Sequence, residues 1–243
     1  MGSEQPLMRM DSATTGRCRQ CALHTLCLPG IVGFLKSTLS SLVADDITFP
    51  KGQTLYGHDD TASNLYVVKS GGFKIMTPLC GHDAHISGFR MPGDLVGACG
   101  LTGDHYAFTA QALSRSTVYR LPFDRRREAQ LRQPVLAQGL LQAIAHQAAQ
   151  AQRQITRTNL PALARFGLLI LDISTHHKKR NLSGTEFELP VPRTDIADSL
   201  ALELETLRRL ISSLTKRQIL MFKGKTVRIL DHHALEHACE VLN

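Results

Sequence analysis

Three cysteines near the start of the chain have a spacing that suits a metal or redox centre. Cys18, Cys21 and Cys27 follow the pattern C-x2-C-x5-C in the stretch CRQCALHTLC. Thiolates are the usual ligands of iron–sulfur clusters, which normally take four of them, and they also bind zinc. The preceding residues, MGSEQPLMRMDSATTG, lack the apolar core of a secretory signal, so we expect a cytoplasmic protein with reduced thiols. A structural disulfide is therefore the weaker interpretation.

Three interpretations of these cysteines stay open on the sequence. The first is a labile [4Fe–4S] cluster with Cys99 as its fourth ligand; Cys80, a carboxylate, a histidine or an exogenous ligand are the alternatives. The second is a set of thiols that bind no cluster and either respond to redox state or have lost their role. The third is a zinc site completed by His24 or another residue. The spacing is longer than in most zinc knuckles, so we favour the cluster.

A second concentration of chemistry is the positive charge near the C-terminus. The chain has a formal net charge of +7. The stretch from Arg193 to Arg228 holds eight Lys or Arg residues against four Asp or Glu residues. Such an excess in one stretch indicates a polyanionic partner, and we expect double-stranded DNA.

The same basic stretch predicts a winged helix-turn-helix. Two short helices joined by a tight turn are expected in PRTDIADSLALELETLRRLISSLTKRQIL, and a two-stranded wing in MFKGKTVRIL. Thr194 is the expected N-cap of the first helix, and the second helix begins near Glu203. In this motif the second helix enters the major groove of DNA.

The predicted second helix carries a face suited to reading bases. Glu205, Arg208 and Arg209 lie at i, i+3 and i+4, so they share one side of the helix. An arginine fork fits guanine and a glutamate accepts from cytosine, whereas lysines suit phosphates. A plain surface salt bridge between Glu205 and Arg209 is the alternative. The expected DNA contacts are Thr194, Glu205, Thr206, Arg208, Arg209, Lys216, Lys223 and Lys225.

Two further elements must position these residues, and together they predict an α+β fold. Short Val-, Ile-, Tyr- and Phe-rich runs between about 47 and 122 predict a β-roll. A long helix follows Pro134, and we expect its stripe to pair with a second copy of the chain rather than to pack within it. The stripe consists of Leu140, Ile144, Ala148, Ala151 and Ile155. The expected domains are a cysteine-rich segment (1–30), a β-roll (31–125), a dimerisation helix (126–158) and a winged helix-turn-helix (159–243).

The sequence does not favour an enzyme or a membrane protein. The stretch HALEH at 233–237 matches a zinc-protease pattern, but we interpret it as one face of a solvated helix. No Ser/His/Asp arrangement, Walker loop or dinucleotide fingerprint is found. The longest apolar run, FGLLIL at 166–171, is too short to span a bilayer.

Seven stretches in this order resemble the CRP/FNR superfamily of bacterial transcription regulators, and most closely its oxygen-responsive FNR branch. They are CRQCALHTLCLPG, KGQTLYGHDD, LYVVKSGGFK, ISGFRMPGDLVG, AQALSRSTVYRLPF, RTDIADSL and LETLRRL, and they cover nearly the whole chain. The resemblance implies a cyclic-nucleotide-binding-type β-roll and a homodimer that reads a pseudo-palindrome with a TGA-like core. It also implies contact with RNA polymerase and an oxygen-sensing [4Fe–4S] cluster bound by Cys18, Cys21 and Cys27.

The chain departs from the family pattern at five places. Tyr119 stands where the family's fourth cluster ligand stands, and Arg208 replaces a usual serine, which affects the outer bases of the half-site. Ala201 replaces the usual turn glycine, so a left-handed backbone there costs about 1 kcal/mol. Ala98 replaces a phosphate-binding glutamate, and HYAFTA lacks the matching arginine, so we expect no cyclic AMP. Another small ligand in the β-roll remains an alternative.

Overall fold

The first half of the computed structural model is a β-roll. The structure describes residues 44–79, 82–122, 134–180 and 182–240, so Cys18, Cys21, Cys27, His24 and Cys80 lie outside the described residues. One four-stranded antiparallel sheet has the order β1-β8-β3-β6 and a second has the order β2-β7-β4-β5. The strands are β1 Ala44–Phe49, β2 Thr54–Tyr56, β3 Asn64–Ser70, β4 Phe73–Leu79, β5 His82–Arg90, β6 Leu95–Val96, β7 Thr109–Ala112 and β8 Ser116–Pro122.

Alternation along the strands divides the apolar residues of the first sheet between two cores. Side chains point to opposite faces at successive positions of a strand. One face joins the interior of the roll, where the rings of Tyr56 and Tyr106 stack with centroids 3.9 Å apart and Tyr66 lies alongside. Burial raises the pKa of both Tyr56 and Tyr106, so their phenols stay neutral. The opposite face, with Leu65, Val67, Leu95 and Leu121, receives the long helix.

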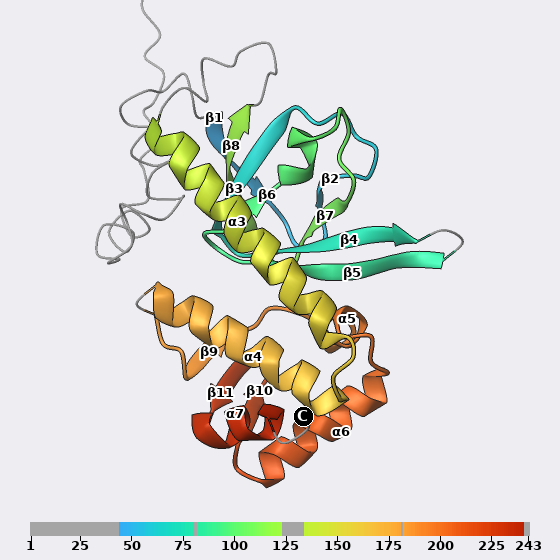
Figure 1. Cartoon of the computed structure of the whole chain (residues 1–243), viewed down its shortest axis with the longest axis vertical. Helices are drawn as coiled ribbons and strands as arrows, with labels where there is room; N and C mark the ends of the chain where they lie inside the picture. Colours follow the sequence, from blue (N-terminus) through green and yellow to red (C-terminus); the bar gives the residue numbers. More distant parts are fainter. Residues whose placement is uncertain (1–43, 80–81, 123–133, 181, 241–243) are drawn as a thin grey trace, which may run out of the picture.

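The second half is helical with a small sheet. Figure 1 shows α3 crossing the β-roll and ending beside the C-terminal module. No described helix is long and apolar enough to cross a membrane. The remaining elements are α3 Pro134–Arg157, α4 Ala162–Lys179, β9 Glu186–Glu188, α5 Arg193–Ser199, α6 Leu204–Lys216, β10 Leu220–Lys223, β11 Thr226–Ile229 and α7 His232–Glu240. The strands β10, β11 and β9 form one antiparallel sheet.

The stripe predicted on the long helix is divided between two faces, which corrects part of the expected dimer interface. Leu140 is only 6% exposed and packs with Ile144 against the α3-facing side of the β-roll. Leu140 is therefore a core residue of its own protomer. Ala148, Ala151 and Ile155 of the same stripe are exposed. The expected stripe therefore combines residues from the roll-facing side and the solvent-facing side of the helix.

The C-terminal module has its own core, which extends into the β-roll. Phe166 and Ile170 of α4 pack there with Leu207 and Leu214 of α6. Leu113, which follows β7 in the roll, is buried in the same core, and Phe89 of β5 packs against it. The two halves of the protomer are thus joined by apolar contacts as well as by the chain itself.

Candidate nucleic-acid interface

Helix α6 is held on one side by the core and exposes the other. Leu207, Ile211 and Leu214 are buried at spacings of four and three, which fixes the rotation of the helix. On the opposite side Glu205, Arg208 and Arg209 have side chains that are 61%, 59% and 79% exposed. The predicted reading face is therefore free to meet a ligand.

Glu205 pairs with both arginines. Its carboxylate lies 3.3 Å from Arg209 Nε and 3.9 Å from Arg208 Nη1. The surface salt bridge considered as an alternative is thus present in the free protein. Exposed pairs of this kind contribute about 1 kcal/mol or less, so base edges can replace these contacts at little cost.

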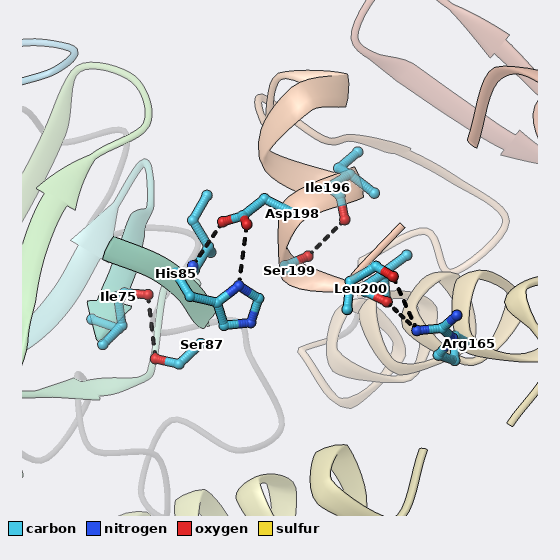
Figure 2. Close-up of polar contacts among 10 residues, drawn as sticks. Ile75, His85, Ser87, Arg165, Ile196, Asp198, Ser199 and Leu200 are labelled. Carbon is cyan, nitrogen blue, oxygen red and sulfur yellow. Dashed lines mark hydrogen bonds and ion pairs between the residues drawn. The ribbon is translucent and has the colours of Figure 1, made fainter. Parts of the chain in front are cut away.

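The turn between α5 and α6 adopts the strained backbone expected for it. Ala201 has a φ of 51°, in the left-handed region. Leu202 N–H donates to the Ala197 carbonyl at 2.9 Å, which closes the turn. Arg165 of α4 donates from Nη1 to the carbonyls of Leu200 at 2.5 Å and Ala201 at 3.3 Å (Figure 2). These bonds hold the start of the reading helix to α4.

Sequence reasoning missed Arg165 as a positioning residue. It lies between the buried residues Ala164 and Phe166, where a charged side chain is unusual on a core-facing part of a helix. That interruption was the one available signal. The carbonyls that Arg165 binds belong to a turn that only the folded chain brings near it.

The predicted capping role of Thr194 is wrong. The N-cap position of α5 is Pro192, without a side-chain cap, and Thr194 lies one residue inside the helix. Its hydroxyl is 3.4 Å from the carboxylate of Asp195. Thr194 is exposed, so its predicted contact with DNA stays a prediction.

The wing and the end of α6 add exposed cations. Lys223 and Lys225 flank Gly224, whose φ of 62° makes the tight turn between β10 and β11. Both lysines and Lys216 are exposed, while Thr206 is half-buried. Exposed cations thus lie on two elements, at the end of α6 and on the wing, and such side chains suit contacts with DNA phosphates.

The described residues do not complete a four-thiolate site. Tyr119 of β8 packs on the α3-facing side of its sheet, with the Lys69 ammonium 5.3 Å from its ring centroid. Cys99, in the short helix η1 (Ala98–Leu101), packs instead with the interior of the roll, which the opposite face of that sheet lines. Cys99 and Tyr119 therefore pack on opposite sides of this sheet, and the expected role of Cys99 as a fourth ligand stays a prediction.

The histidines of the zinc-protease pattern form no such site. His233 and His237 of α7 are exposed, and the nearby Glu236 lies 3.3 Å from His232. Across the part of the chain that the structure describes, no three His, Cys, Asp or Glu side chains form a group that could bind a metal ion.

Known protein families and relatives share the two domains described above. The Cyclic nucleotide-binding domain family matches residues 46–131, and the Crp-like helix-turn-helix domain family matches residues 163–238. The chain is 31% identical over 226 residues to the Transcriptional activator protein FnrA of Stutzerimonas stutzeri, covering 92% of this chain and 93% of that protein. The chain belongs to the CRP/FNR family.

Other members of the CRP/FNR family give the same result. The Fumarate and nitrate reduction regulatory protein of Vibrio cholerae is 31% identical over 239 residues, with 97% of this chain and 96% of the relative covered. The structure of FixK2 from Bradyrhizobium japonicum superposes with a TM-score of 0.72 at 25% identity, covering 81% of this chain and 98% of that one. The expected β-roll and winged helix-turn-helix are confirmed, and the chain is an FNR-type DNA-binding transcription regulator. These relatives are regulators, and no enzyme family is indicated.

Proposed function

We propose that the protein is a homodimer that reads a two-fold symmetric DNA site with a TGA-like core in each half. The observation that carries this proposal is the exposed face of α6, where Glu205 stands between Arg208 and Arg209. Glutamate and arginine in this arrangement can bind cytosine and guanine edges on adjacent base pairs. Lys216, Lys223 and Lys225 would bind the flanking phosphates.

The exposed side of α3 supports pairing with a second copy. Leu141 and Ile155 are 69% and 72% exposed, which is unusual for large apolar side chains. Ala145, Ala148 and Gln152 lie between them, also exposed, and the steps of four, three, four and three follow a coiled-coil heptad. Of the stripe expected from the sequence, Ala148 and Ile155 belong to this seam, which carries no acidic residue.

RNA polymerase is the further partner that the family resemblance implies. Cyclic AMP is not expected as a ligand of the β-roll. In support of this, the stacked rings of Tyr56, Tyr66 and Tyr106 fill part of the roll interior. Ala98, at the position of the family's phosphate-binding glutamate, offers no polar group to a cyclic phosphate.

We infer control by oxygen or redox state through Cys18, Cys21 and Cys27. Three thiolates at this spacing would hold three corners of a [4Fe–4S] cluster, which supplies reactivity toward oxygen when bound. Tyr119 supplies no thiolate at the position of the family's fourth ligand. Thiol oxidation without a cluster remains the alternative.

The proposed DNA site is tested by selecting binding sequences from random duplexes with the full chain, alongside sedimentation of the free protein. The expected result is a dimer and an enriched palindrome whose half-sites lie about 10 base pairs apart. A protein that stays monomeric, or that enriches no palindrome, would contradict the proposal.

The cysteine site is tested by anaerobic purification with iron, sulfide and visible-absorption measurements. We expect Cys18→Ser to lose iron, whereas Cys99→Ser keeps it, because Cys99 packs with the interior of the roll. Iron loss in Cys99→Ser would instead identify that residue as the fourth ligand. Colourless, iron-free wild-type protein would leave thiol oxidation as the mechanism.

A further inference from the structure

The first helix of the helix-turn-helix is fastened to the β-roll by two carboxylates. Asp195 and Asp198 lie three residues apart on α5, so they share one side of that helix. Both face the hairpin made by β4 and β5, which Figure 1 shows directly above α5. The sequence alone does not indicate that these residues meet.

Asp198 binds the free edge of a sheet. Among the described strands β5 is the last of its sheet, so one row of its backbone groups has no partner in those strands. Asp198 accepts the Ile86 N–H at 2.7 Å through one carboxylate oxygen, and the other oxygen lies 3.1 Å from His85 Nδ1 (Figure 2). The carboxylate thus satisfies an edge donor that would otherwise be left to water.

Asp195 makes the second connection through a more enclosed ion pair. Its carboxylate accepts from Lys74 Nζ at 2.9 Å, and the two side chains are only 17% and 18% exposed. Charge pairs shielded from water in this way are screened by salt much less than exposed pairs. A third connection lies further along, where His176 and Arg180 of α4 bond the Pro92 carbonyl.

These contacts leave the reading face uncovered. The side chains of Glu205, Arg208 and Arg209 remain at least 59% exposed while α5 is held. The tight turn and its bonds from Arg165 link α5 rigidly to α6, so fixing α5 also fixes the reading helix. The contact is therefore suited to aiming the module rather than to blocking it.

We propose that Asp195 and Asp198, with Lys74, His85 and the Ile86 amide, form a latch that orients the DNA-binding module on its protomer. A two-fold site requires two reading helices about one DNA turn apart. A module that swings freely must be ordered when it binds, and that entropy cost weakens the complex. The latch residues are positioning residues, and their role in DNA binding rests on the proposed function.

The latch itself is tested without DNA by amide hydrogen exchange of Ile86 in the full chain labelled with 15N-isoleucine. Protection is expected in the wild type and loss of protection in Asp198→Ala. Asp198→Asn should keep partial protection, because the amide oxygen still accepts one hydrogen bond. Equal exchange of Ile86 in the wild type and Asp198→Ala would overturn the latch.

The aiming role is tested with two duplexes, one carrying the selected palindrome and one carrying a single half-site. Asp198→Ala should bind the palindrome about tenfold more weakly than the wild type, because only part of its population is correctly oriented. Half-site binding and the salt dependence should not change, since no phosphate contact is lost. A module that had merely unfolded would lose half-site binding as well.

Two further variants act as partner and control. Lys74→Met should also weaken palindrome binding selectively, from the β-roll side of the latch. Glu186→Gln removes the charge from the 2.7 Å ion pair with Arg228, which lies wholly within the winged module, and should leave the ratio of palindrome to half-site binding unchanged. Unchanged or tighter palindrome binding by Asp198→Ala would overturn the aiming role. Wild-type protein indifferent to palindromes would overturn the proposed function, while the Ile86 exchange still decides whether the latch exists.

Discussion

At the scale of single residues, Ala201 lowers the stability of the turn in the helix-turn-helix, because its backbone is left-handed. Ala201 holds a φ of 51°, which glycine adopts without the steric penalty of a Cβ. The side chain is exposed, so removing it opens no cavity. The carbonyl bonds from Arg165 compensate for part of this strain by fixing the turn from outside.

We expect Ala201→Gly to raise the free energy of unfolding by about 1 kcal/mol, less the entropy that glycine adds to the unfolded chain. Thermal and urea unfolding of the purified protein measure the change. The matched control is Ala197→Gly inside α5, which should destabilise, since glycine is unfavourable in a helix interior. A lower stability for Ala201→Gly would show that the left-handed turn is not strained.

Substitutions in the reading helix and in the wing should change DNA binding in different ways. Arg209→Ala removes a side chain placed for a base edge, so selectivity should relax at one base pair by about 1–3 kcal/mol. Lys225→Ala removes an exposed wing cation, so binding to every duplex should weaken and the salt slope should fall by about 1. Affinities measured over a salt series on matched and mutated sites separate the two. Identical behaviour of both variants would contradict the assigned roles.

At the scale of elements, the two sides of α3 have separate tasks. Leu140 is buried against the β-roll and Leu141 is exposed, although the two are adjacent in sequence. We expect Leu141→Glu to dissociate the dimer with little change in the monomer fold. Leu140→Ala should cost about 2–5 kcal/mol of stability and leave the seam intact. Sedimentation and urea unfolding of both variants provide the measurement, and a monomeric Leu140→Ala at unchanged stability would reverse the assignment.

Periodicity predicted the elements better than it predicted their partners. The second helix of the helix-turn-helix begins at Leu204, as expected from its apolar spacing, and the wing turns at Gly224. The α3 stripe failed because Leu140 and Ile155 both fit an apolar pattern that does not say which core receives each one. The polar stretch HHKKRNLSG at 176–184 has the composition of a link, but its first four residues form the last turn of α4, where cationic side chains favour the negative end of the helix dipole.

In the candidate site, too, the sequence predicted the elements but not the contacts between them. The exposed face of α6 could be read from spacing, because Leu207 and Leu214 define the buried side. The contacts of Arg165 and Asp198 could not, because their partners are backbone groups of distant segments. Backbone donors and acceptors are the same at every residue, so the sequence carries no local sign of which ones a side chain meets.

At the scale of the whole molecule, the two halves of the protomer share one hydrophobic core. Leu113 belongs to the β-roll by sequence and to the core of the C-terminal module by packing. We expect Leu113→Ala to cost about 2–5 kcal/mol and to speed amide exchange in α4 and α6. Leu121→Ala, a buried residue on the α3-facing side of the roll, is the control and should leave exchange in α6 unchanged. Equal effects of the two variants on α6 would contradict the shared core.

The placement of the aromatic residues makes the two halves optically distinct. The chain has four tyrosines, at 56, 66, 106 and 119, and no tryptophan. All four lie in the β-roll, and three of them stack in its interior. Tyrosine emission therefore comes from the roll alone, while the α-helical signal of the described residues in far-ultraviolet circular dichroism comes from α3 and the helices after it. A single sample without any attached dye can thus show whether a solvent, a temperature or an oxidant disturbs one half before the other.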